Sequence, residues 1–111
     1  MLNIRKSMHL DEYQKAAGDY QLENAPPEER VFGLLEEAGE VAGVFKRMLR
    51  GDYPPDVAAS KLHKELGDQL WYLARIAADN GWDLSDVAKA NLDKLESRKI
   101  RNVIMGQGDN R

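Results

Sequence analysis

The chain has 111 residues, of which 42% are hydrophobic and 32% charged, with a net charge of −3 and no cysteine. This composition fits one globular domain over residues 1–111, and it excludes disulfides, thiolate metal sites and the basic face of a protein that binds a nucleic-acid polymer. Because no apolar run approaches the ~20 residues of a membrane span and no signal peptide is evident, we expect a cytoplasmic protein without membrane partners.

Four segments carry apolar residues at three- and four-residue intervals, which predicts four helices. The first covers residues 10–20, the second 27–49 and the third 57–80. The fourth follows Asp83, its expected N-cap, and the tail from Met105 onward lacks apolar periodicity. The predicted fold class is therefore all-α, a bundle of four to five helices. A chain this short gains buried surface from a second subunit, so we expect an oligomer.

Two acidic clusters lie inside the second and third predicted helices. Glu36, Glu37 and Glu40 form the first, and Glu65 and Asp68 the second. A solvated acidic face is the ordinary interpretation, but carboxylates four residues apart repel each other on a helix. The pairs Glu37/Glu40 and Glu65/Asp68 share a spacing of three residues, so facing helices could place four carboxylates in one gap. Such a group must protonate, pair with bases or bind a hard divalent cation such as Mg²⁺, which points to phosphoryl chemistry.

The interior of these two helices gives further hints of close contact. Gly33, Gly39 and Gly43 each cost up to ~1 kcal/mol relative to alanine within a helix, which suggests close approach of another helix or a ligand. The third helix is apolar on two sides, with a leucine stripe on one and Trp71 and Ala74 on the other. We therefore expect it to form the subunit interface.

An amide and two cations follow the helical repeat of the fourth predicted helix. Asn91, Lys94 and Arg98 fall on or beside its inner face. Buried polar groups need partners. They either form salt bridges with the acidic clusters or hold the phosphates of a substrate.

Three motifs of this chain resemble the signature of the MazG-like family of all-α nucleoside triphosphate pyrophosphohydrolases. They are Glu36-Glu37-x-x-Glu40, Glu65-x-x-Asp68 and Asn91-x-x-Lys94-Leu95-x-x-Arg98. The similarity extends over about residues 10–100. It implies a MazG-like helical bundle, assembled as a homodimer or homotetramer. The implied reaction is hydrolysis of a nucleoside triphosphate, either a deoxynucleotide or a non-standard one, to the monophosphate and pyrophosphate.

The same resemblance implies roles for individual residues. The ligands of Mg²⁺, or of Mn²⁺ in its place, would be Glu37, Glu40, Glu65 and Asp68. Glu36 would be a further ligand or the catalytic base that activates water. The substrate's phosphate or sugar would be contacted by Asn91, Lys94 and Arg98. The ending Gly108-Asp109-Asn110-Arg111 is also similar to that of a MazG-like subgroup, which implies that the tail folds over a site where Arg111 touches phosphate.

Two other classes of protein use similar residues. A carboxylate-bridged di-iron bundle needs a glutamate with a histidine three positions later, and neither His9 nor His63 makes such a pair. A non-catalytic acidic helical module that binds a basic partner stays open as the alternative, and it predicts no dependence on Mg²⁺. The aromatic residues stay open between base stacking and ordinary packing: Tyr53, Trp71, Tyr72 and Trp82.

Overall fold

The computed structural model describes residues 7–102, 104–106 and 108–109. Its helices are α1 (Leu10–Ala17), α2 (Pro27–Leu49), α3 (Pro55–Asp79) and α4 (Leu84–Ile100), with one 3₁₀ turn, η1 (Gly18–Tyr20), after α1. No strand occurs in the described part of the chain, so the all-α prediction is confirmed. No helix within the same residues has both the length and the apolar character needed to cross a membrane.

Proline and glycine set the helix boundaries. Each of the two long helices has a proline in its first turn, where the missing N–H costs nothing. Helix α3 begins two residues before the predicted Val57, because Pro54 takes the N-cap position and Pro55 the first helical one. Gly51 (φ 83°) and Gly81 (φ 75°) provide the left-handed backbone that follows α2 and α3.

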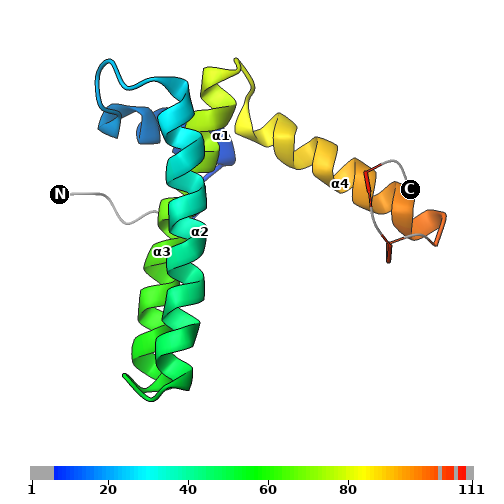
Figure 1. Cartoon of the computed structure of the whole chain (residues 1–111). Helices are drawn as coiled ribbons and strands as arrows, with labels where there is room; N and C mark the ends of the chain where they lie inside the picture. Colours follow the sequence, from blue (N-terminus) through cyan, green and yellow to red (C-terminus); the bar gives the residue numbers. More distant parts are fainter. Residues whose placement is uncertain (1–6, 103, 107, 110–111) are drawn as a thin grey trace.

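Helices α2 and α3 form an antiparallel hairpin, and the other two helices meet it at one end (Figure 1). Helix α1 lies against the last turns of α3, whereas α4 leaves this end and extends away from the hairpin (Figure 1). The Cα radius of gyration is 16.9 Å, compared with about 13 Å for a compact domain of 100 residues. A single chain therefore does not close the predicted bundle.

Side chains of α1, rather than of Asp83, hold the start of α4. Asp83 occupies the N-cap position as predicted, but its side chain makes no capping hydrogen bond. Instead, the Leu84 N–H donates to Gln14 Oε1 (2.9 Å), and the Ser85 N–H and hydroxyl donate to the Asp11 carboxylate (2.9 and 2.6 Å). The two hydrogen bonds from Ser85 lower the pKa of Asp11. The direction of α4 is therefore fixed by two residues some 70 positions earlier.

An ion pair between the buried Arg30 and the largely covered carboxylate of Asp79 joins the first turns of α2 to the last turn of α3. Arg30 is only 5% exposed, and its Nε and Nη2 donate to the two carboxylate oxygens of Asp79, with an Nη2–Oδ1 distance of 2.7 Å. Two parallel charge-assisted hydrogen bonds also fix the relative orientation of their partners. This pair locks the hairpin at the end where α1 and α4 attach.

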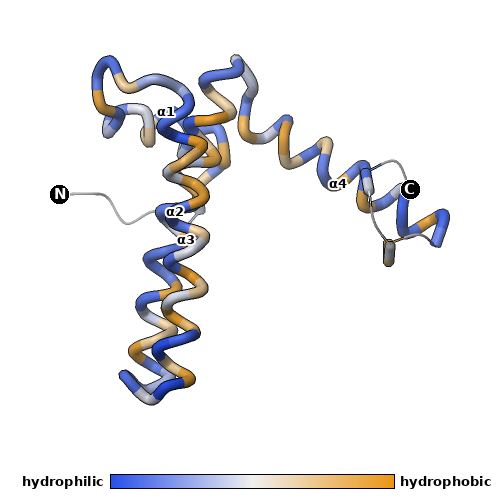
Figure 2. The backbone as a smooth tube through the Cα atoms, in the orientation of Figure 1, coloured by the Kyte–Doolittle hydropathy of each residue, from blue (hydrophilic) through white to orange (hydrophobic). Residues whose placement is uncertain are grey.

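The apolar residues of the long helices are only partly covered within one chain. The buried hydrophobic residues are Ala17, Val44, Ala58, Ala74, Ala77 and Leu84, most of them small. Many of the larger members of the predicted stripes are exposed, namely Val31, Leu35, Phe45, Leu49, Leu66, Leu70 and Leu73. Figure 2 shows apolar positions recurring along the hairpin and also along the separate α4. On the second apolar side of α3, Trp71 faces α1 and donates from Nε1 to the Ala17 carbonyl (3.0 Å). The role of α3 as the subunit interface stays a prediction.

The three glycines of α2 have different surroundings. A Cβ built on Gly33 would lie 2.3 Å from Cε1 of Tyr72, so the absence of a side chain there makes room for the tyrosine ring of α3. At Gly43 the neighbour is Arg47 of the same helix. Nothing described lies within 4 Å of a Cβ at Gly39. The predicted close approach is confirmed at Gly33 alone.

Candidate metal centre

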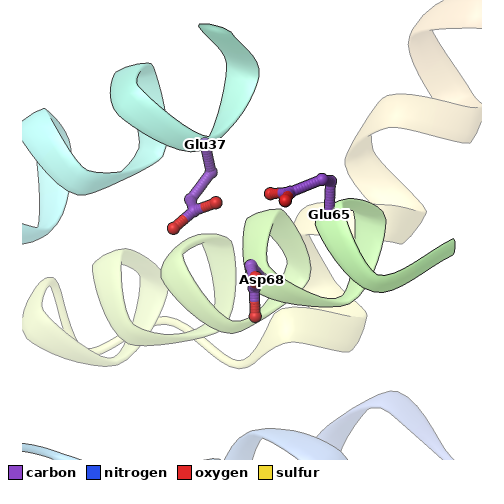
Figure 3. A group of neighbouring side chains, drawn as sticks. All are labelled: Glu37, Glu65 and Asp68. Carbon is purple, nitrogen blue, oxygen red and sulfur yellow. The ribbon is translucent and has the colours of Figure 1, made fainter. Parts of the chain in front are cut away.

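Three carboxylates meet in the gap between the hairpin helices. Glu37 of α2 and Glu65 and Asp68 of α3 each offer one oxygen, and these atoms lie within 4.8 Å of one another. Figure 3 shows the Glu37 and Glu65 carboxylates approaching each other from opposite helices, with Asp68 one turn along α3. The antiparallel hairpin brings together residues that are 28 and 31 positions apart in sequence. This acidic triad (Glu37, Glu65, Asp68) includes three of the four predicted metal ligands.

Full ionisation of the acidic triad is unfavourable below neutral pH unless a cation is bound. The pKa of Glu37 is raised from 4.5 to about 7. The main cause is a hydrogen bond shared with Glu65, followed by burial and by the negative charges of Asp68, Glu65 and Glu36. Two carboxyl groups share a hydrogen bond only when one of them carries a proton. Above neutral pH this proton leaves, and the repulsion must be met by a positive charge.

An unpaired atom in the acidic triad fits a metal ligand. Glu65 Oε2 is buried and has no hydrogen-bond partner among the described residues. A buried acceptor without a donor is rare in folded proteins, and a bound cation would satisfy it. Oxygen donors on three carboxylates are the set that Mg²⁺, Mn²⁺ and Ca²⁺ prefer. The residues present therefore fit a hard divalent cation held by Glu37, Glu65 and Asp68.

Glu36 and Glu40 lie outside the acidic triad. Both are exposed on α2, and neither belongs to the group whose oxygens lie within 4.8 Å of one another. The charge of Glu36 nevertheless acts on the acidic triad, since it raises the pKa of Glu37. The role of Glu40 as a ligand and the role of Glu36 as a further ligand or the base stay predictions.

Tyr72 lies beside the acidic triad. Its ring packs edge-on against Trp71, with centroids 5.0 Å apart. Burial raises the pKa of Tyr72, and the charges of Glu37, Glu36 and nearby acids raise it further. Trp71 and Tyr72 also line a pocket of about 220 Å³ with Tyr20 and Arg30 among its other walls. The sequence did not indicate which aromatic residues would lie near the carboxylates, because their neighbours come from another helix.

The predicted phosphate-binding residues do not reach the acidic triad of their own chain. Helix α4 carries Asn91, Lys94 and Arg98 away from the hairpin (Figure 1). Asn91 is exposed, while Lys94 and Arg98 both pair with Asp109 of the tail at 3.2 Å. The alternative in which these cations form salt bridges with the acidic clusters is not seen within one chain. Arg111 lies outside the described residues.

The raised pKa of Glu37 predicts how stability depends on pH without metal. The folded protein holds the proton of Glu37 more tightly than the unfolded chain does. Its contribution to the free energy of unfolding is therefore complete below pH 4.5 and is lost as the pH rises to about 7. We expect the thermal midpoint in EDTA to fall over this window more in the wild type than in Glu37→Gln. The difference corresponds to at most about 3 kcal/mol, reduced by solvent screening.

Mg²⁺ provides the complementary test of the same cluster. It binds only the folded, ionised form, so it should raise the midpoint of the wild type more at pH 8 than at pH 5.5. Midpoints from circular dichroism, with and without Mg²⁺, measure both effects. Parallel pH curves for the wild type and Glu37→Gln would show that the carboxylates do not interact as described.

Comparison with known proteins identifies the family. The sequence profile of the MazG nucleotide pyrophosphohydrolase domain matches residues 26–102. The gene 37 protein of Mycobacterium phage L5 is 40% identical to this chain over 114 aligned residues, which cover 94% of this chain and all of the phage protein. No solved structure matches the chain. The profile match includes α2, α3 and α4 and all three residues of the acidic triad, so the chain belongs to the MazG nucleotide pyrophosphohydrolase family.

Proposed function

We propose that this protein hydrolyses a nucleoside triphosphate, a deoxynucleotide or a non-standard one, to the monophosphate and pyrophosphate in a reaction that depends on Mg²⁺. The observation that supports this most strongly is the acidic triad of Glu37, Glu65 and Asp68 in a chain of the MazG family. A half-buried cluster with an unpaired acceptor needs a cation, and a triphosphate brings its own negative charge to such a cation.

In this proposal the carboxylates divide into ligands of the ion and one base. When bound, Mg²⁺ supplies positive charge that polarises the phosphate oxygens and offsets the charge that develops on them. Glu37, Glu65 and Asp68 hold the ion, and Glu40, one turn along α2 from Glu37, acts as a fourth ligand. Glu36 is exposed next to the acidic triad, so its carboxylate is free to accept a proton from the attacking water.

The cations of α4 complete the site from a second copy of the chain. In one chain α4 extends away from the acidic triad, and most leucines of α2 and α3 are exposed. Exposed apolar surface of this extent is typical of a subunit interface. We therefore propose a homodimer or homotetramer in which Asn91, Lys94 and Arg98 contact the phosphates or sugar of a nucleotide bound at a neighbouring triad, with Arg111 as a further phosphate contact.

A panel of deoxynucleoside, ribonucleoside and modified triphosphates tests the reaction. We expect pyrophosphate and the matching monophosphate in equal amounts with Mg²⁺, and also with Mn²⁺, but no turnover in EDTA. Ion-exchange chromatography of the products distinguishes pyrophosphate from phosphate, and light scattering gives the oligomeric state. Release of single phosphates, or turnover that is unaffected by EDTA, would contradict the proposal.

The alternative of a non-catalytic acidic module has less support. A surface that attracts a basic partner needs solvated, fully charged carboxylates. Glu37 and Glu65 are instead half-buried, and their shared hydrogen bond raises the pKa of Glu37 to about 7. Absence of turnover together with unchanged thermal midpoints on adding Mg²⁺ would favour this module.

A further inference from the structure

The C-terminal tail folds back onto α4. Positive φ angles at Gly106 (126°) and Gly108 (85°) occur beyond the end of the helix, where the chain reverses its direction. Asp109 thereby reaches Arg98 and Lys94, which are 11 and 15 positions earlier. Figure 1 shows the red part of the tail beside the last turns of α4.

One carboxylate oxygen of the tail is shared by two cations. Asp109 Oδ1 accepts hydrogen bonds from Lys94 Nζ and from Arg98 Nη2, each at 3.2 Å. Arg98 Nη2 also donates to the Gly108 carbonyl at 3.3 Å. The hydrogen bonds from Lys94 and Arg98, together with their charges, lower the pKa of Asp109. The tail therefore places an anion on the two residues proposed to bind phosphate.

Arg98 retains a donor that the tail does not use. Its residue exposure is only 5%, and its Nε is buried without a hydrogen-bond partner in the described part of the chain. A guanidinium group presents parallel donors that match two oxygens of one anion. Asp109 engages Nη2 alone. A free phosphate group is not tethered to the chain as Asp109 is, so two of its oxygens can engage both Nη2 and Nε.

The tail carboxylate is also easy to displace. The Asp109 side chain is 82% exposed, and that of Lys94 is 39% exposed. Ion pairs with an exposed partner are weak, since solvent and salt compete for both charges. An anion of higher charge that arrives from solution can therefore replace Asp109 without disturbing the helix.

We propose that Asp109 is an internal competitor for phosphate, which occupies Lys94 and Arg98 until a phosphate group of the substrate or of pyrophosphate displaces it. The Asp109 carboxylate then rests on the two cations without ligand and leaves them when the phosphate group binds. This inference rests on the proposed role of Lys94 and Arg98 in phosphate binding. It assigns the tail a regulatory role at the same site.

Pyrophosphate binding to the full-length protein tests the competition. Removing the competing charge in Asp109→Asn should tighten the binding of inorganic pyrophosphate about twofold to fivefold by titration calorimetry with Mg²⁺, the range expected for a weak surface ion pair. The gain should shrink at high salt. Asp109→Glu keeps the charge and should bind as the wild type does. In the wild type, the amide resonance of Gly108 should shift as pyrophosphate saturates the protein.

Asp93→Asn is the matched control, because it removes one charge from an exposed position of α4 next to Lys94. A similar gain in pyrophosphate affinity in Asp109→Asn and Asp93→Asn would show that net charge alone causes the effect, and it would overturn the proposed competition. Unchanged or weaker binding in Asp109→Asn would also overturn it, as would absence of pyrophosphate binding in every variant. Hydrolysis with no change in pyrophosphate affinity in Asp109→Asn would refute the competition alone. Tighter binding without turnover of any triphosphate would refute the proposed function alone.

Discussion

Glu65→Gln is expected to reduce triphosphate hydrolysis by at least about 10²–10³-fold while leaving the fold intact. Glu65 contributes the buried Oε2 that has no hydrogen-bond partner among the described residues, and its hydrogen bond with Glu37 raises the pKa of Glu37. Glutamine has nearly the same shape but no charge, so the cluster loses part of its affinity for Mg²⁺. The same change relieves repulsion with Glu37, so the thermal midpoint without metal should stay equal or rise.

Initial rates at increasing Mg²⁺ concentration measure this effect, because a lost ligand shifts the Mg²⁺ dependence to higher concentration. Glu23→Gln is the control, since Glu23 is an exposed acid in the turn before α2. It should keep the activity and the Mg²⁺ dependence of the wild type. Retention of more than about a tenth of the activity in Glu65→Gln would place the metal elsewhere.

Asp79→Ala is expected to lower the free energy of unfolding by about 3–5 kcal/mol, because it leaves the guanidinium of Arg30 buried without its counter-ion. For a domain of this size the thermal midpoint should fall by on the order of 15 °C or more. Urea unfolding followed by circular dichroism measures the change. The hairpin holds the acidic triad, so Mg²⁺ binding should weaken as well.

Two further variants test whether the loss of stability in Asp79→Ala comes from the buried guanidinium or from the removal of any charge. Arg30→Met combined with Asp79→Leu removes both charges and should recover most of the lost stability, since apolar replacement of a buried pair is often neutral. Asp52→Ala breaks the exposed pair of Asp52 with Arg50 (2.6 Å) and should cost at most about 1 kcal/mol. Equal losses in Asp79→Ala and Asp52→Ala would contradict the assignment of Arg30 and Asp79 as a buried pair.

The sequence predicted the features that depend on neighbouring residues. The helical repeat and Pro27 gave the bounds of α2, and the repeat also located α3 and α4 to within a few residues. The spacing of acids by three residues placed Glu65 and Asp68 on one side of α3, and the structure groups them with Glu37. These predictions succeed because helix geometry relates residues three and four apart irrespective of the rest of the fold.

Contacts between distant residues were not predictable in the same way. Gln14 and Asp11 hold the start of α4, and Arg30 binds Asp79 across 49 positions. No local spacing marks such partners, since glutamine, aspartate and arginine are all ordinary residues of a solvated helix face. The exposure of Glu40 and the choice of Tyr72 as the aromatic residue beside the acidic triad likewise depend on how α2 and α3 are rotated against each other.

The sequence by itself determined the helices, the family and the carboxylates from which the metal centre is built, because these depend on residue type and spacing along single helices. The tertiary structure decided which carboxylates meet, and it placed α4 away from the acidic triad with its cations on Asp109. The packing of α1 against both α3 and α4 sets that direction, and it involves atoms far apart in the chain. Local periodicity contains no information about such contacts.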